Sequence, residues 1–186
     1  MKKLLTPIVC LLILACKKTE VVEPVKVYEL SVDSVLTRDG KRSLPKDVNG
    51  YYHLQLQSAP NGLMYSQQTH RITGRILVNG TQPNPSEKVI WESNLHWYLK
   101  QGDTIAQVTK SYINYFNGQF TIVNLPPLIS NQEQLVKTIN CCSYSGIGGE
   151  INTMIAPISN MKGDTMVVKT EHYESRKILY TKIVLD

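Results

Sequence analysis

Residues that could do acid, base or metal chemistry are scattered along this chain. The four histidines lie far apart in the sequence: His53, His70, His96 and His172. A tetrahedral metal site usually draws at least two ligands from one tight spacing, so no metal site is predicted. Four acidic residues could supply the carboxylate pair of a glycoside hydrolase: Glu92, Asp103, Glu133 and Glu150. Such a pair is defined by a separation of about 5–10 Å in space, which a sequence does not give. We therefore predict no catalytic residue and no cofactor.

An aromatic cluster is the best candidate for ligand binding. In the stretch WESNLHWYL, residues 91–99, Trp91 and Trp97 share one parity, and Tyr98 takes the other if the strand is unbroken. We expect both tryptophans to be core residues, as is typical of β-sandwiches. The alternative is a tyrosine face that stacks on a sugar ring or binds a protein partner. Its candidate residues are Tyr98, Tyr112 and Tyr115.

Three short segments could be modified rather than catalytic. They read Asp-Ser-Val, Asp-Thr-Ile and Asp-Thr-Met, and they resemble the O-glycosylation sequon of exported Bacteroidota proteins. The resemblance implies attachment at Ser34, Thr104 and Thr165. The alternative is that the Asp-Ser and Asp-Thr pairs only end turns.

The N-terminal residues have the pattern of an export signal. Lys2 and Lys3 precede an apolar stretch, residues 4–15, that is shorter than the roughly 20 residues of a membrane-spanning helix. Residues 12–16, Leu-Ile-Leu-Ala-Cys, resemble the lipobox of bacterial lipoproteins. The resemblance implies that residues 1–15 are a cleaved lipoprotein signal peptide and that Cys16 carries the lipid. An ordinary signal peptide with a chance cysteine is the alternative.

The segment after Cys16 indicates where such a protein would be held. Residues 16–26 are charged, β-branched and contain Pro24, so we expect the lipidated cysteine and a short extended tether. The segment loosely resembles the one that follows the lipidated cysteine in surface-exported Bacteroidota lipoproteins. Lys17 stands where an aspartate retains many enteric lipoproteins at the inner membrane, so the resemblance implies the outer membrane, with the periplasmic or exterior side left open.

Length and composition limit the number of domains and the kinds of partner that this chain can have. The 186 residues correspond to about one domain, and 42% apolar residues are enough for a core. Without Lys2 and Lys3 the formal charge falls from +5 to +3, which is too small and too dispersed to indicate a nucleic-acid partner.

Cys141 and Cys142 are the thiols that would remain once Cys10 leaves with the signal and Cys16 is lipidated. Side chains of adjacent residues in a strand point to opposite faces, so an ordinary bridge between them needs backbone distortion. We expect two unbridged small apolar residues. A vicinal disulfide and an intermolecular link are the alternatives, since the exported compartment permits oxidation.

From Val27 onward the apolar residues alternate with a period of two, which predicts half-buried strands. Five pairs typical of tight turns separate these runs: Asp39-Gly40, Asn49-Gly50, Asn61-Gly62, Asn79-Gly80 and Asn117-Gly118. The matching tetrapeptides GDTI, residues 102–105, and GDTM, residues 163–166, predict two equivalent turns. The chain is therefore expected to be all-β.

Residues 71–93 resemble the strand, Pro-rich turn and strand of carboxypeptidase-regulatory-like and bacterial Ig-like domains, and residues 148–157 are similar to a late turn and strand of such domains. The resemblance implies an Ig-like antiparallel β-sandwich over residues 66–186, preceded by an N-terminal β-hairpin region over residues 27–65. It brings no active site with it.

Together these features predict a membrane-anchored lipoprotein that acts as a non-catalytic binding or structural module of the cell envelope. Its expected partners are the membrane, through the N-terminal lipid, and envelope proteins or glycans. The alternatives are a subunit of an outer-membrane complex and an envelope-glycan hydrolase whose site the sequence hides.

Overall fold

The structure is a computed structural model that describes residues 25–37, 39–58, 65–66, 68–83, 85–106, 109–113, 120–124 and 128–186. This part of the chain is nearly all β, as predicted, with one short 3-10 helix. The elements are β1 (Tyr28–Leu36), β2 (Tyr52–Leu54), β3 (Tyr65–Ser66), β4 (His70–Val78), β5 (Gln82–Pro83), β6 (Lys88–Ser93), β7 (His96–Leu99), β8 (Thr104–Ala106), β9 (Thr109–Ile113), β10 (Phe120–Asn124), β11 (Leu128–Ile129), β12 (Gln134–Lys137), β13 (Cys142–Tyr144), β14 (Glu150–Ile155), η2 (Ser159–Met161), β15 (Thr165–His172) and β16 (Ile178–Leu185).

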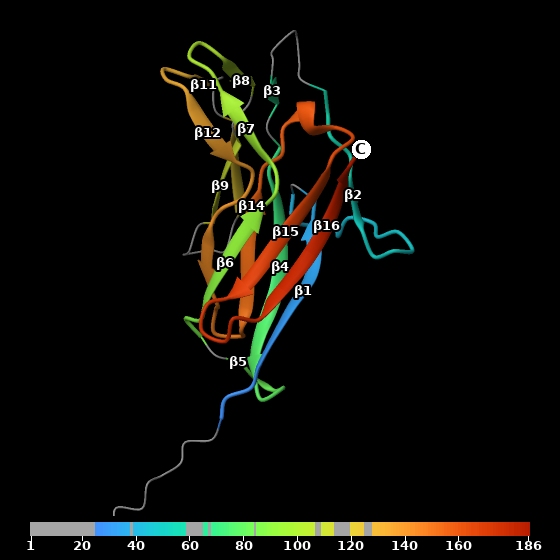
Figure 1. The fold of residues 1–186 in the computed structure, drawn as a ribbon, viewed down its shortest axis with the longest axis vertical. Helices are drawn as coiled ribbons and strands as arrows, with labels where there is room; N and C mark the ends of the chain where they lie inside the picture. The colour runs from blue at the N-terminus through green and yellow to red at the C-terminus, as the bar shows by residue number, and fades with distance from the viewer. Residues whose placement is uncertain are drawn as a thin grey trace, which may run out of the picture.

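Two sheets are arranged as a sandwich (Figure 1). The first has the strand order β1-β4-β14, with β5 paired to the end of β4, and the second has the order β13-β6-β15-β16-β2. Neighbours in these sheets are antiparallel except β16 and β2, which are parallel. Smaller sheets lie at the upper end of Figure 1, where β12 pairs with β7 and β11 and β3 flank β8.

The predicted period of two is confirmed in the strands that carry the core. In β4 every second residue from His70 to Val78 is buried, and in β15 the same holds from Met166 to His172. The buried side chains of both sheets form one apolar cluster, in which Trp91 of β6 is the largest fully buried side chain. Burying such alternating faces against each other is the main stabilising term of a sandwich.

The parity predicted for the tryptophans is also confirmed. Trp91 in β6 and Trp97 in β7 are buried, whereas Tyr98 is exposed. The strand is broken between them, because Asn94 leaves the ladder and binds β15 by its side chain, accepting from Val167 N at 2.7 Å and donating to Thr165 O at 3.1 Å. β7 then pairs with β12 rather than β15.

The expected turns are found where the structure describes them. Gly40, Gly50 and Gly80 have φ values of 69°, 79° and 77°, in the left-handed region that glycine adopts without strain. The pairs Asn61-Gly62 and Asn117-Gly118 lie outside the described residues.

The two GDT turns are equivalent, as predicted. Gly102 donates to Ser130 O while Ser130 donates to Asp103 O, and Gly163 donates to Leu185 O while Leu185 donates to Asp164 O. Each turn therefore forms the same pair of backbone hydrogen bonds with a single residue, which is Ser130 just after β11 in one case and Leu185 in β16 in the other.

The region expected as an N-terminal hairpin contributes to both sheets of the sandwich. β1 pairs along its length with β4, and β2 pairs with the end of β16. Within the described residues, β1 and β2 are joined by a side-chain bond, in which Tyr52 Oη donates to the carbonyl oxygen of Asp33 at 3.2 Å.

Gly74 lies in the middle strand β4, at a point where β1 approaches it closely. It is opposite Val32, beside a bulge between Val32 and Ser34. A Cβ atom at this position would clash with the backbone carbonyl oxygen of Ser31. The pairing of β1 with β4 therefore requires glycine here.

We expect Gly74→Ala to lower the free energy of unfolding by about 1–3 kcal/mol, because β1 must shift to admit the methyl group. Urea denaturation followed by tryptophan fluorescence measures this change. Arg75→Ala, on the exposed side of the same strand, is the matched control and should stay within about 0.5 kcal/mol of wild type. Equal stability of wild type and Gly74→Ala would contradict the packing argument.

Candidate functional site

Of the predicted tyrosine face, one side chain can be described. Tyr98 is 49% exposed and donates its hydroxyl to Glu133 Oε2, and this carboxylate raises the pKa of Tyr98. Tyr112 lies in β9, where its side chain is outside the description, and Tyr115 lies outside the described residues, as does the predicted lipidation site Cys16. Whether the three tyrosines share a face therefore stays a prediction.

The predicted modification sites differ in their surroundings. Thr165, at the start of β15, is exposed, and Thr104, at the start of β8, is half-buried. The Ser34 hydroxyl is half-buried in β1 and lies 2.8 Å from Thr73 Oγ1 of β4. Thr165 is therefore the most accessible of the three hydroxyl groups.

The carboxylates considered for hydrolysis have separate partners. Glu92 contacts Lys169, Glu133 accepts from Tyr98, and Asp103 Oδ2 accepts the backbone N–H of Lys100 at 2.9 Å. Glu150 is exposed at the start of β14. Of three surface hollows among the described residues, one is lined by Glu92, and none is lined by two of these acids.

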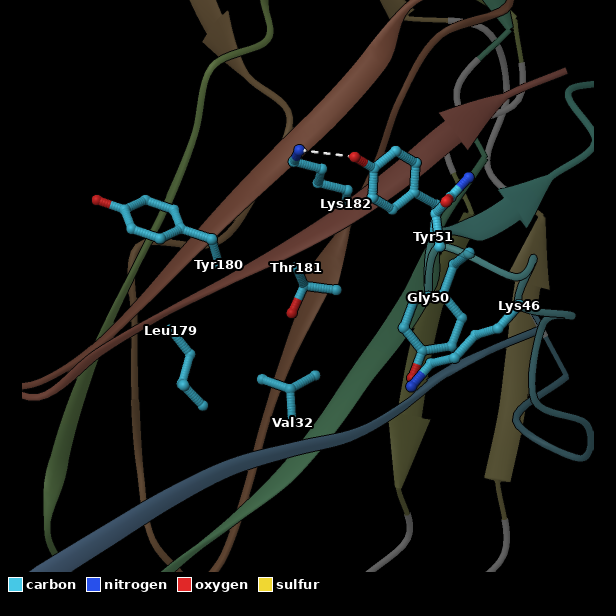
Figure 2. Close-up of a pocket in the computed structure, with 10 residues that line it drawn as sticks. Val32, Lys46, Gly50, Tyr51, Leu179, Tyr180, Thr181 and Lys182 are labelled. Atoms are coloured by element: carbon cyan, nitrogen blue, oxygen red, sulfur yellow. Dashed lines mark hydrogen bonds between the residues drawn. The ribbon is translucent and has the colours of Figure 1, made fainter.

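A groove lies where β1, an edge strand of the first sheet, runs beside β16 of the second (Figure 2). It has a volume of about 340 Å³. Figure 2 shows Thr181 and Leu179 of β16 directed towards Val32 of β1, with Tyr180 and Lys182 directed away from it. The lining residues are Val32, Lys46, Asn49, Gly50, Tyr51, Tyr52, Leu179, Tyr180, Thr181 and Lys182.

Lysines and tyrosines dominate the polar part of this groove. Lys182 Nζ donates to Tyr51 Oη at 2.9 Å and lies 4.7 Å from the centre of the Tyr51 ring. Lys46 Nζ lies 4.5 Å from the centre of the Tyr52 ring, within the range of a cation–π contact. The groove therefore presents positive charge next to aromatic surface.

The turn that supplies Lys46 and Tyr51 is held by Asp47. Its Oδ1 accepts the backbone N–H groups of Asn49 at 2.9 Å and Tyr51 at 2.8 Å. Both bonds lower the pKa of Asp47, and the bond from Tyr51 has the larger effect. An aspartate that caps a turn in this way fixes the backbone of the residues it encloses.

His53 links the same turn to Asp186. Its Nδ1 lies 2.8 Å from Asp186 Oδ2, and its Nε2 lies 3.7 Å from Asp47 Oδ2. The hydrogen bond with Asp186, and then the contact with Asp47, raise the pKa of His53. When protonated, the imidazole joins two carboxylates beside the turn.

Because the folded-state pKa of His53 is raised, the ion pairs contribute their full stability below the unfolded pKa, about 6.5, and lose it as pH rises through the folded pKa. We expect His53→Gln to lower the melting temperature more at pH 6 than at pH 9.5, as measured by circular dichroism. In an Asp186→Asn background this difference should shrink. A deficit independent of pH would contradict the assignment.

A second, buried polar cluster was not anticipated from the sequence. His172 Nε2 lies 2.9 Å from Glu87 Oε2, and Nδ1 lies 2.7 Å from Ser175 Oγ and accepts the Ser175 backbone N–H at 3.3 Å. Nε2 of the neutral ring therefore carries the hydrogen donated to Glu87. Next to it, burial and then a hydrogen bond to Glu174 raise the pKa of Tyr28 to about 12.

Carboxylate, imidazole and hydroxyl in this order are also the groups of a serine hydrolase. Here, however, His172 is fully buried and Ser175 lies in the turn between β15 and β16. Ser175 lines none of these three hollows. The cluster ties this turn to the segment before β6, and we assign it to the fold.

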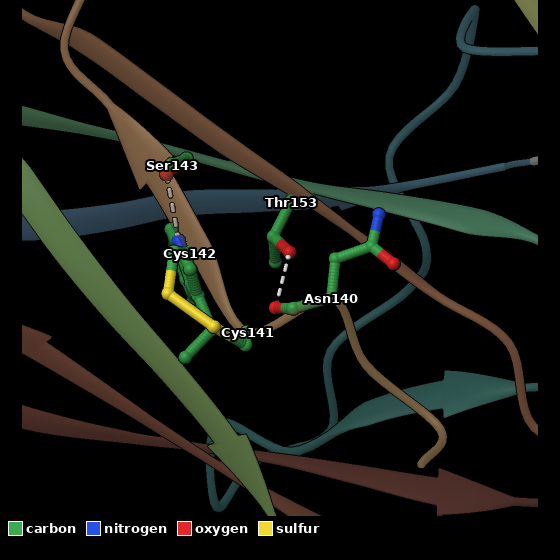
Figure 3. Close-up of a disulfide and its surroundings, with 6 residues drawn as sticks. Asn140, Cys141, Cys142, Ser143 and Thr153 are labelled. Atoms are coloured by element: carbon green, nitrogen blue, oxygen red, sulfur yellow. Dashed lines mark hydrogen bonds between the residues drawn. A yellow bond between two sulfur atoms is a disulfide. The ribbon is translucent and has the colours of Figure 1, made fainter. Parts of the chain in front are cut away.

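Cys141 and Cys142 are joined by a vicinal disulfide (Figure 3). The expectation of two unbridged residues is therefore wrong in this structure, and one of its alternatives holds. The physical reason is that Cys141 precedes β13 while Cys142 begins it, so only one of the two cysteines lies in the strand. Both cysteines are exposed, and Ser143 beside them accepts the Trp91 indole N–H at 2.8 Å.

We expect the tryptic peptide that spans residues 138–162 to take up no alkylating reagent when the denatured protein is labelled without reductant. After reduction it should take up two groups, because each sulfur is then a free thiol. Peptide mass spectrometry measures both states. Two groups attached without reductant would rule out the disulfide, whereas a crosslinked pair of chains would indicate an intermolecular bond.

In the part of the chain that the structure describes, no three His, Cys, Asp or Glu side chains gather closely enough to hold a metal ion. No helix in that part has the length and apolar character needed to cross a bilayer. The chain matches no protein-family model, no curated protein and no solved structure.

The groove residues were missed at the sequence level, although part of their signal was present. Tyr180 and Lys182 have the outward parity of β16, and Tyr51 follows the Asn49-Gly50 turn. The sequence did not predict that β1 and β16 lie beside each other.

Proposed function

We propose that this chain is a lipid-anchored, non-catalytic binding module of the cell envelope. The observation that carries the binding role is the groove between β1 and β16, where Lys182 lies against the Tyr51 ring and Lys46 lies against the buried Tyr52 ring. The anchor is supported by the lipobox-like residues 12–16, and the outer membrane by Lys17 after the cysteine.

In this proposal the lipid and the sandwich have separate tasks. Each buried methylene of an acyl chain contributes about 0.8 kcal/mol, so two or three chains on Cys16 would hold the protein durably in a leaflet. Residues 16–26 would act as the tether. Recognition would then take place on the sandwich, without any covalent step.

A second candidate is a subunit of an outer-membrane complex. It is favoured by the edge of β16, where residues 178–182 pair with β15 on one side while β2 reaches only residues 183–185 on the other. An edge with free backbone groups can receive a strand from another protein. The ammonium group of Lys182 at this edge opposes non-specific pairing.

The anchor is tested by Cys16→Ser in the full chain expressed in a Bacteroidota host. We expect wild type to partition into the detergent phase of a Triton X-114 extraction with a mass that includes acyl chains. Cys16→Ser should lose both properties, because the thioether cannot form on an alcohol at this position.

Cys10→Ser, inside the proposed signal, is the matched control and should behave as wild type. Unchanged partitioning and an unacylated wild-type mass would overturn the proposed anchor. Protease added to intact cells reports, in the same strains, on which side of the outer membrane the sandwich lies.

A further inference from the structure

We propose that the groove between β1 and β16 binds an acidic glycan, with its carboxylates at Lys46 and Lys182 and its sugar rings against Tyr51 and Tyr180. This inference deepens the proposed binding function and rests on it. It specifies a ligand class, which neither the anchor nor the fold requires.

The first argument is the state of the two lysines. Among the residues that the structure describes, neither Lys46 nor Lys182 forms an ion pair, and both ammonium groups contact tyrosines. Lys169, in the strand next to Lys182, shows the contrast, because its Nζ lies 2.8 Å from Glu171 and 3.1 Å from Glu92. The two groove lysines thus have no carboxylate partner among the described residues, whereas Lys169 in the neighbouring strand has two.

The second argument concerns the acids around the groove. None of its ten lining residues is Asp or Glu. The nearby acids are committed elsewhere: Asp47 and Asp186 to His53, and Asp33 to Arg75 and Ser31. A cleft lined by charge of one sign attracts a ligand of the other, so an anionic ligand fits.

The third argument distinguishes a sugar from a simple anion. Tyr180, which lines the groove, is 65% exposed, and Tyr51 offers a second aromatic surface beside Lys182. An aromatic face covers the apolar side of a sugar ring, and its hydroxyl can bond the ring substituents. Lys46 and Lys182 contact different tyrosines, and two separate ammonium groups suit a chain with repeated carboxylates.

The fourth argument is preorganisation. Asp47 fixes the turn through two backbone N–H groups, and His53 joins that turn to Asp186. Gly50 permits the turn with a φ of 79°. Lys46 and Tyr51 are thus attached to a backbone that is ordered before binding, which reduces the entropy lost on association.

The test is isothermal titration of the full-length lipidated protein, in detergent micelles, with three probes. Oligogalacturonate carries rings and carboxylates, its methyl ester carries the same rings without charge, and polyphosphate carries charge without rings. We expect oligogalacturonate to bind at least about tenfold more tightly than either of the others, because charged and stacking contacts then act together.

Variants assign the binding to this groove. Lys182→Gln, Lys46→Gln and Tyr180→Ala should each weaken oligogalacturonate binding by about tenfold. Lys162→Gln, at an exposed lysine after η2, is the matched control and should bind as wild type. Circular dichroism verifies that each variant is folded.

Equal affinity for the acid and its methyl ester would overturn the role of the lysines. Equal affinity for polyphosphate would overturn the role of the rings, and binding that none of the three variants weakens would overturn the groove. Failure to bind any probe would overturn the glycan inference. The Cys16→Ser experiment is independent of all these outcomes, so the proposed anchor stands or falls separately.

Discussion

The groove depends on a constraint of the sandwich, namely that β1 and β16 lie beside each other but belong to different sheets. β1 forms its ladder with β4, and β16 forms its ladder with β15. β2 extends the second sheet beyond β16 only over residues 183–185, so in the described residues the earlier part of β16 has one strand partner. Side chains rather than hydrogen bonds therefore occupy the space between the two strands, and Val32, Leu179 and Thr181 line it.

One segment, residues 46–52, lines this space and provides several of its polar groups. The end of β2 and the residues after it are held to Asp186 on both sides of Gln55, since Asp186 N donates to Leu54 O at 2.9 Å and Leu56 N donates to Asp186 O at 2.8 Å. Tyr52, which is buried, reaches across to the carbonyl oxygen of Asp33 in the bulge of β1. The segment that carries Lys46 and Tyr51 is thus fastened to both sheets, and the geometry of the groove is linked to the stability of the fold.

The strands, the turns and the inward tryptophans were predictable because they follow from local rules. A period of two places Ile72 and Ile76 in the core whatever their partners are, and Asn79-Gly80 takes positive φ values from its own chemistry. The groove and the His172 cluster were not predictable, because each joins residues that are far apart in the chain. Glu87 meets His172 through the pairing of β6 with β15, and Val32 meets Thr181 through the packing of two sheets, and a single sequence specifies neither. The disulfide was missed for a different reason, since the prediction placed both cysteines inside one strand and β13 begins at the second.

Strand register decides which lysines remain available to a ligand. In β15, Lys169 is opposite Glu92 of β6 and two residues from Glu171, so it has two carboxylates on its own face. Lys182 of β16 is opposite Val167, and the other side of β16 has no strand partner at that residue among those described. Its ammonium group therefore turns to the Tyr51 hydroxyl, a neutral acceptor that leaves the charge in place. Because a shift of one residue would exchange the two faces of β16, the same register that buries Thr181 and Ile183 also keeps the positive charge of Lys182 at the groove.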